Sequence, residues 1–272
     1  MTPEQLSLAV SAYLGASFGG FLFAWAWEGG APLRPGPVAA SRRSHLARHF
    51  AMLALVVVVS DLAFAQGVLR IPERLFAPTD GLLTPFALPA AALVVVGLVV
   101  LDLYEYAVHR LAHAWRPLWL LHAVHHSDPH VDFSTGARHH PIENMIVIAG
   151  RLGVYLALGL PLWIEALRAT LVNLALTLQH ANVAFPRGIE ALRGLLVTPA
   201  VHRVHHSADA PLTDRNFGQL LSVWDRWFGT YAEPAGDAPV VYGLRRLAGE
   251  RWQTLRGMLM TPLAARRIDG PL

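Results

Sequence analysis

Residues 102–143 read DLYEYAVHRLAHAWRPLWLLHAVHHSDPHVDFSTGARHHPIE and hold eight of the fourteen histidines in the chain. Histidine is the commonest metal ligand, since a neutral imidazole offers a lone pair without a charge that must be desolvated. The stretch contains an H-x-x-x-H spacing that starts at His109 and an H-x-x-H-H spacing that starts at His122. Residues three or four apart share one face of a helix. The stretch therefore predicts helices that direct several imidazoles at one point.

A second H-x-x-H-H spacing lies far downstream, in VTPAVHRVHHS at residues 197–207. Two copies of this spacing are improbable by chance when histidine makes up only 14 of 272 residues. Imidazoles that face one another are costly to bury without a metal or proton partner. We therefore interpret the set as a site for two metals with four ligands each. The predicted ligands are His109, His113, His122, His125, His126, His202, His205 and His206.

The composition is typical of a membrane protein. Hydrophobic residues make up 54% of the chain and charged residues 15%, and mean hydropathy is +0.38; soluble domains carry roughly 25% charged residues. The chain has no cysteine, so any metal must be held by nitrogen and oxygen. It also has no lysine, and its arginines lie beside apolar stretches. This pattern favours the rim of a membrane protein over nucleic-acid binding, and we expect no nucleic-acid partner.

Several stretches, taken in order, resemble motifs of the fatty acid hydroxylase/sterol desaturase superfamily. They are HRLAH (109–113), RHHPIE (138–143), LQHANV (178–183), TPAVHRVHHS (198–207) and SVWDRWFGTY (222–231). The resemblance covers residues 102–231, nearly half of the chain. It implies a membrane-embedded, histidine-ligated non-haem di-iron oxidase. Such an enzyme uses O2 to hydroxylate or desaturate an unactivated C–H bond of a fatty acyl, sterol or isoprenoid-like lipid.

The resemblance adds candidates to the site. It points to His180 as a ninth metal ligand, with a buried histidine bonded to a backbone carbonyl as the alternative. His140 is expected either to bind metal or to position substrate or the ligands. Imidazole ligands usually donate their second N–H to a carboxylate or carbonyl. Candidates for that role are Asp102, Glu105, Asp132, Glu143 and Asp225, although Asp132 and Glu143 could equally pair with Arg138 at the surface.

Apolar stretches predict the membrane spans. Residues 6–27, 50–69 and 81–101 are each about long enough to cross a hydrocarbon core of about 30 Å. Residues 145–164 and 171–185 predict a hairpin that either crosses the bilayer or dips into it. Residues 29–48 carry four arginines and three prolines, so they predict a loop, and the positive-inside rule places that loop in the cytoplasm. Two further crossings then bring both histidine groups to the cytoplasmic side.

These observations predict an all-α integral membrane bundle of about four transmembrane helices. A cytosolic helical cap would carry the histidine motifs. The chain is expected to form one domain, with residues 1–101 mainly transmembrane, 102–231 as the di-iron core and 232–272 as a cytosolic tail. Electrons would come from a separate ferredoxin-like or haem protein. The absence of lysine and the abundance of alanine and arginine hint at a GC-rich bacterial genome, and so at a bacterial inner membrane.

Two other classes of protein remain possible from the sequence. A metal transporter would also be rich in histidine, but its ligands should lie near the bilayer midplane. A zinc-dependent membrane hydrolase could use His109 and His113, but residue 110 is arginine where the H-E-x-x-H mechanism needs glutamate. The sequence leaves the lipid substrate, the regiochemistry and the electron donor open.

Overall fold

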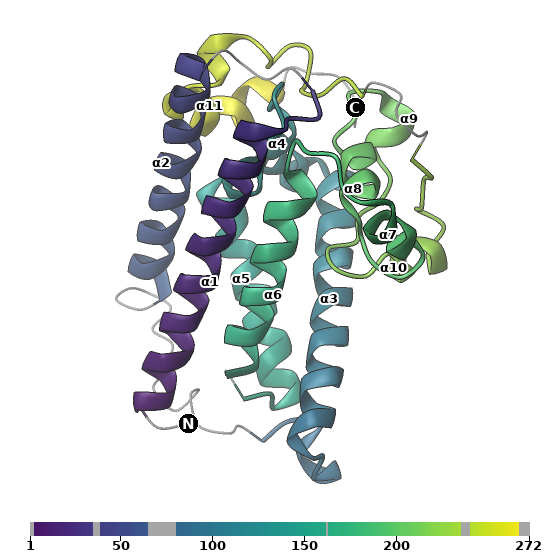
Figure 1. The fold of residues 1–272 in the computed structure, drawn as a ribbon. Helices are drawn as coiled ribbons and strands as arrows, with labels where there is room; N and C mark the ends of the chain where they lie inside the picture. Colours follow the sequence, from purple (N-terminus) through teal and green to yellow (C-terminus); the bar gives the residue numbers. More distant parts are fainter. Residues whose placement is uncertain (1–2, 35–38, 65–79, 162, 235–239, 267–272) are drawn as a thin grey trace.

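The computed structural model describes residues 3–34, 39–64, 80–161, 163–234 and 240–266. Every regular element in these ranges is a helix, and pairing between extended segments is limited to three isolated bridges. The predicted all-α class is confirmed. Five long helices lie side by side in Figure 1: α1 (Pro3–Gly30), α2 (Ala39–Phe64), α3 (Ala90–Ala114), α5 (Pro141–Leu158) and α6 (Trp163–His180).

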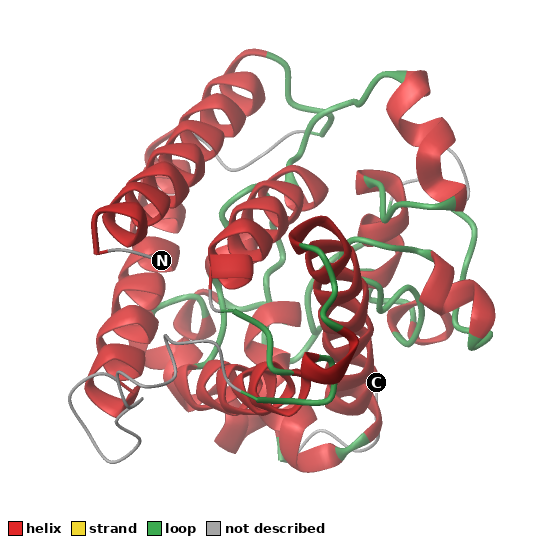
Figure 2. Cartoon of the chain, turned by 90° about the horizontal axis from the view of Figure 1, so that it is seen from below, coloured by secondary structure: helices red, strands yellow, loops and turns green. Residues whose placement is uncertain are grey.

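Short helices gather around one end of this bundle, the upper end in Figure 1. They are α4 (Arg116–His126), α7 (Arg187–Glu190), α8 (Pro199–His205), α9 (Ala210–Thr213), α10 (Val223–Trp227) and α11 (Leu255–Ala265). Four single turns of 3-10 helix complete the secondary structure, at Thr84–Phe86, Thr135–Ala137, Ala191–Gly194 and Glu250–Trp252. Figure 2 views the bundle from the opposite end. The end of α1 and the start of α2 lie at the same end of the bundle as α4 and α8.

Three helices of the described chain are long and apolar enough to cross a membrane. They cover Ser41–Ala63, Ala90–Ala114 and Pro141–Leu158, with mean hydropathies of 1.8, 2.0 and 1.3. These helices identify an integral membrane protein. The expected count of about four crossings stays a prediction. The predicted span 6–27 lies in α1, and several side chains of α1 are not among those that the structure describes.

The helices differ from the predicted spans at their ends. The predicted loop 29–48 was wrong for its second half, because α2 already begins at Ala39. Nothing after Pro37 prevents helix formation, and Arg42 and Arg48 find partners in Glu28 and Ser44. The third span starts at Ala90, since Pro89 holds an extended conformation just before the helix. The end of the predicted span 50–69 and residues 70–79 lie outside the described residues.

The predicted hairpin is formed by α5 and α6. Gly159 ends α5 in the left-handed conformation (φ 71°), and its N–H bonds to the carbonyls of Tyr155 and Leu156. Glycine adopts this conformation without steric cost, which explains the tight turn between the two helices. The helix α6 then runs back toward the upper end of the bundle and finishes at His180.

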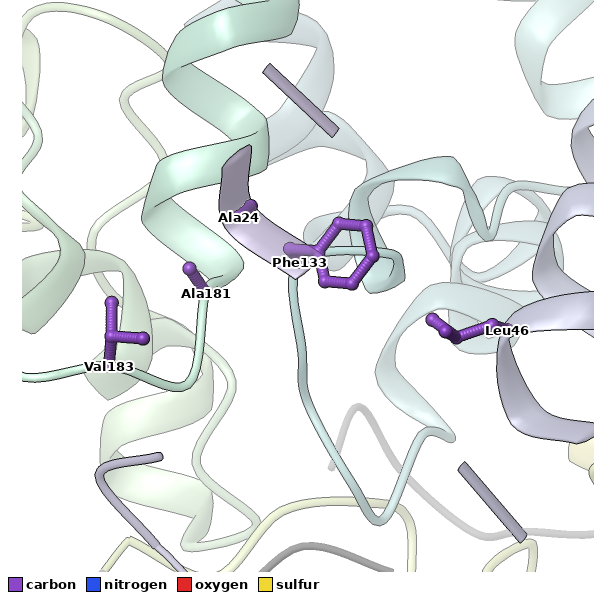
Figure 3. Packing of buried hydrophobic residues seen from close by; sticks show 5 residues of the cluster. All are labelled: Ala24, Leu46, Phe133, Ala181 and Val183. Carbon is purple, nitrogen blue, oxygen red and sulfur yellow. The ribbon is translucent and has the colours of Figure 1, made fainter. Parts of the chain in front are cut away.

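An apolar cluster fixes the loop between α4 and α5 against the long helices. Phe133 from this loop is 2% exposed and packs with Ala24 of α1, Leu46 of α2, and Ala181 and Val183 beyond α6. Figure 3 shows its ring pointing toward Leu46, with Ala181 and Val183 on the other side. Burial of a phenylalanine side chain is worth about 1.5–3 kcal/mol. The cluster therefore ties the histidine-bearing end of the bundle to α1 and α2.

Gly81 provides a test of the tight turn between α5 and α6, because it lies directly against the backbone of that turn. A Cβ at this position would overlap the backbone nitrogen of Gly159. We expect Gly81→Ala to destabilise the detergent-solubilised protein by about 1–3 kcal/mol, as overpacking does elsewhere. Gly153→Ala is the matched control, since a Cβ there meets nothing within 4 Å. Thermal unfolding midpoints should fall for the first variant only; equal midpoints would contradict the close contact.

Candidate metal centre

The nine histidines predicted as ligands come together in two buried clusters at the upper end of the bundle. Within each cluster, one ligand nitrogen from every residue lies within 4.8 Å of the others. The first cluster contains His109, His113, His122, His126 and His205. The second contains His125, His180, His202 and His206. The division is therefore five and four, whereas the sequence predicted four for each metal with His180 as an addition.

The two H-x-x-H-H segments cross over between the clusters. On α4, the outer pair His122 and His126 enters the first cluster, and the middle residue, His125, enters the second. At α8 the arrangement is reversed, because His202 and His206 enter the second cluster and His205 enters the first. This division follows from helix geometry, since residues four apart share a face while the residue between them points to one side. Each segment thus contributes to both clusters.

The loop after α9 orients three imidazoles of the first cluster. The Nδ1 atom of His113 lies 3.1 Å from a carboxylate oxygen of Asp214. The Nδ1 atoms of His205 and His109 lie 2.8 Å and 2.9 Å from the carbonyl oxygens of Arg215 and Phe217. Imidazole N–H donates in each of these bonds, which fixes the tautomer with the lone pair on Nε2. One short loop therefore sets the direction of three candidate ligands.

The loop itself is held in a strained conformation by its neighbours. Asn216 has a positive φ of 57°, and its side-chain amide donates to the carbonyls of Val201 and Ala232. Asp225 accepts hydrogen bonds from the N–H groups of Phe217 and Gly218, each at 2.8 Å. Together these bonds stabilise a left-handed backbone conformation that residues other than glycine adopt uncommonly. This loop was not predicted from the sequence, where the Asn-Phe-Gly turn at 216–218 was its one visible signal.

Unpaired nitrogens test whether the first cluster fits a metal ion. The Nε2 atoms of all five of its histidines are buried and have no hydrogen-bond partner among the described residues. A buried polar atom without a partner is costly and rare. Five such atoms around one point fit a cation, because each directs a lone pair toward it.

The second cluster brings its nitrogens still closer together. The Nε2 atom of His180 lies 2.9, 3.0 and 3.3 Å from the Nε2 atoms of His202, His206 and His125. Ligand bonds of about 2.1 Å separate neighbouring nitrogens by roughly 3.0–3.4 Å, so this spacing fits one shared ion. The Nδ1 atom of His180 also lies 2.7 Å from the carbonyl oxygen of Leu176. His180 can therefore bond to a backbone carbonyl through Nδ1 and still offer Nε2 to a metal ion, so the two alternatives considered for it are compatible.

Burial favours the neutral form of five imidazoles on the short helix α4 and at α8. It lowers the pKa of His205 to about 3, with a smaller contribution from His122. Burial is also the main cause that lowers the pKa of four further histidines on α4 and at α8, and neighbouring imidazoles lower it further. These are His125, His126, His202 and His206. Because metal ions bind neutral imidazole, these five side chains are in their ligating form at neutral pH.

Among the five carboxylates considered from the sequence, only Glu143 contacts a histidine of the two clusters. Its Oε1 atom lies 2.6 Å from Nδ1 of His122. Asp102 accepts from the N–H groups of Leu220 and Leu221 and from the indole of Trp224, and so anchors the segment before α10 to α3. Asp225 holds the orienting loop, as described above.

Glu105 and Asp132 have other partners. Glu105 pairs with Arg151 on α5, and Asp132 accepts from Ser134 in its own loop. The expected surface pairing of Asp132 and Glu143 with Arg138 was wrong, because all three side chains are buried and neither carboxylate bonds to this guanidinium. The spacing of charges along the chain does not reveal which of them the fold encloses.

His140 and His139 lie at the edge of the site. His140 caps the N-terminus of α5, where its Nδ1 accepts the N–H of Ile142 at 3.2 Å, and it belongs to neither cluster. His139 stacks on His125, with ring centroids 4.6 Å apart and an interplanar angle of 11°. Its Nδ1 also lies 3.5 Å from the free oxygen of Glu143. His139 therefore packs behind the second cluster, while His140 acts on the helix.

A buried polar network supports α4, and the sequence analysis did not foresee it. Arg138 is fully buried; its Nε donates to the carbonyl of Val124, and its two terminal nitrogens donate to Ser127 and Gln253. Val124 lies inside the α4 segment that carries His122, His125 and His126. His49 of α2 also contacts Arg138, because its Nε2 lies 3.2 Å from a terminal nitrogen of the guanidinium. The i, i+4 spacing of His45 and His49 was the signal for a buried helix face.

A cavity of about 260 Å³ opens directly against the two clusters. His109 and His122 from the first cluster and His125, His180 and His202 from the second line it. Leu53 and Val56 of α2 and Val172 and Leu176 of α6 add an apolar wall. The cavity therefore gives a ligand access to both clusters from between the membrane helices.

Comparison with known proteins identifies the family. A profile described as fatty acid hydroxylase matches residues 94–230, which is half of the chain and includes all nine histidines of the two clusters. The chain belongs to the fatty acid hydroxylase family. No solved structure matches it.

Individual relatives share about half of this chain. The ornithine lipid hydroxylase OlsE of Rhizobium tropici is 38% identical over 151 residues, 54% of this chain and 44% of that protein. The alkylglycerol monooxygenase of Caenorhabditis elegans is 31% identical over 146 residues, 53% of this chain and 28% of its own length. The sphingolipid C4-hydroxylase sur2 of Schizosaccharomyces pombe is 30% identical over 144 residues, 52% and 48%. The matched region spans less than half of each relative.

Replacing one histidine from each cluster tests the division into two sites. His205→Ala removes a nitrogen from the first cluster and His125→Ala from the second, so each variant should lose at least one of two bound metal ions. Elemental analysis of the purified protein measures this loss. His130→Ala is the control, because His130 lies in neither cluster. Full metal content in both cluster variants would contradict the assignment.

Proposed function

We propose that this protein is an O2-dependent di-iron oxidoreductase that hydroxylates an unactivated C–H bond of a membrane lipid. The observation that carries the proposal is the pair of buried histidine clusters that face one cavity. Nine imidazoles exceed the needs of one ion, because structural zinc takes four ligands and catalytic zinc three. A dinuclear centre uses this number.

Iron is the metal that family membership favours, since imidazole alone suits zinc, copper, iron and nickel alike. Two bound iron ions would supply the redox chemistry that lets O2 oxidise a C–H bond. All nine histidines of the clusters, His109, His113, His122, His125, His126, His180, His202, His205 and His206, would hold them. The relatives named above are called hydroxylases or a monooxygenase, which supports hydroxylation over desaturation.

The chain's own residues would prepare the site in two ways. Glu143, Asp214 and the carbonyls of Arg215 and Phe217 hold the imidazoles in one tautomer. The apolar side chains of α2 and α6 exclude water from the cavity beside the clusters. Water exclusion strengthens electrostatic interactions and limits side reactions of the oxidant.

The overall reaction consumes one O2, two electrons and two protons, and yields one hydroxylated lipid and one water. A separate ferredoxin-like or haem protein would donate the electrons. We further propose that residues 1–272 form one domain in a bacterial inner membrane, with the clusters on the cytoplasmic side. The start of α2, which carries Arg42, Arg43 and Arg48, lies at the same end of the bundle as both clusters, which supports this orientation.

The two other classes fit the site less well. The imidazoles gather at the ends of α3 and α6, whereas a transporter should bind its ion near the middle of the bundle. The residue after His109 is Arg110, which cannot act as the general base of a zinc hydrolase of the H-E-x-x-H type.

Isotope labelling tests the proposal. Membranes that contain the protein, given reductant and oxygen-18 gas, should yield a lipid that carries one oxygen-18 atom, and mass spectrometry of lipid extracts detects it. Membranes with His125→Ala should yield none. An oxidised lipid whose oxygen comes from water, or no oxidised lipid from iron-loaded protein, would contradict the function.

A further inference from the structure

The cavity against the clusters has a second wall that is charged. Glu105 of α3, Arg151 of α5 and Arg168 of α6 line it beside the apolar side chains, together with Gln219 from the loop before α10. Glu105 and Arg151 lie within helices apolar enough to cross a membrane. Charged side chains in such helices are costly and usually functional.

These side chains form an ion network. The Oε1 atom of Glu105 accepts from Arg151 at 2.6 Å and lies 3.5 Å from Arg168. Both arginines also pair with Glu165, at 3.2 Å from Arg151 and 2.6 Å from Arg168. Two arginines and two glutamates balance in charge, so the network adds polarity to the cavity without adding net charge.

A buried ion network is a costly way to join three helices. Replacing a buried ion network with apolar side chains of similar volume is often neutral or stabilising, so leucines could join the three helices at lower cost. Three of the four charged residues also line the cavity instead of being sealed behind it. Hydrocarbon packed against guanidinium and carboxylate groups would desolvate them further, whereas a polar ligand would not.

Gln219 adds an independent observation. Its Oε1 atom is buried and has no hydrogen-bond partner among the described residues. Gln219 follows two residues after Phe217, whose carbonyl accepts the N–H of His109. An acceptor without a partner beside the clusters fits a ligand that brings an O–H or N–H donor.

Building on the proposed function, we propose that the cavity binds the polar head of the lipid, so that oxidation occurs at a carbon in or next to the head and not in the middle of an acyl chain. The head would carry both donors and acceptors, as amino, amide or hydroxyl groups do. Glu105 precedes His109 by one helical turn, about 6 Å of rise. About four bonds of roughly 1.5 Å cover that distance.

The size of the cavity agrees with this assignment. Its volume of about 260 Å³ is below the roughly 300–1,000 Å³ of pockets that enclose a whole small ligand. It can enclose the head of a lipid, while the acyl chains remain between the helices and in the bilayer. In the reaction, one C–H bond of the head region becomes C–OH, and the second oxygen atom leaves as water with the two electrons and two protons given above.

Tandem mass spectrometry locates the added oxygen. Lipids are extracted from cells that express the protein and from cells that express the His125→Ala variant, and each oxidised lipid is fragmented. The added oxygen should appear in fragments of the head or of its link to the chains. Oxygen in the middle of an acyl fragment would overturn the inference and leave the proposed function intact. No oxidised lipid from iron-loaded protein would overturn both.

Two variants test the polar wall itself. Gln219→Leu and Arg151→Met should each lower the yield of oxidised lipid by about tenfold or more while the protein keeps two metal ions per chain. Arg193→Met is the matched control, because Arg193 is 45% exposed and pairs with Glu233 away from the cavity. Unchanged yields from both wall variants, with metal retained, would contradict a role of this wall in binding the head.

Discussion

The structure depends on the burial of nine imidazoles at one end of a helical membrane bundle. A buried imidazole has two nitrogens to satisfy, one as a donor and one as an acceptor. Protein groups occupy Nδ1 of His109, His113, His122, His180 and His205, and no residue that the structure describes occupies Nε2 in the first cluster. A metal ion would occupy the remaining Nε2 atoms, so ion binding would stabilise this end of the bundle.

The fold around the clusters serves this requirement. The helices α3 and α6 continue to the upper end of the bundle and deliver His109, His113 and His180. The short helix α4 is fixed by Arg138, while α8 is linked through His205 to the loop that orients the first cluster. The crossing of the two H-x-x-H-H segments between the clusters couples the two proposed ion sites through α4 and α8. Displacement of either helix would disturb both.

The sequence predicted the helical class and brought the nine histidines together, because helical spacing and shared residue chemistry act locally. It did not predict how they divide, since the crossover depends on how α4 and α8 face each other. The supporting roles of Arg138, His49 and the loop from Asp214 to Phe217 were also not predicted. Their roles arise from contacts between residues far apart in the chain, such as Arg138 with Gln253. The start of α2 was misplaced because hydropathy marks the membrane-embedded part of a helix and not the whole helix.

Anomalous diffraction at the iron absorption edge, from crystals of the iron-loaded protein, tests the central claim most directly. The account predicts two separate peaks, one among His109, His113, His122, His126 and His205 and one among His125, His180, His202 and His206. A single peak, or two peaks outside these clusters, would contradict a dinuclear centre built by the two crossing histidine segments.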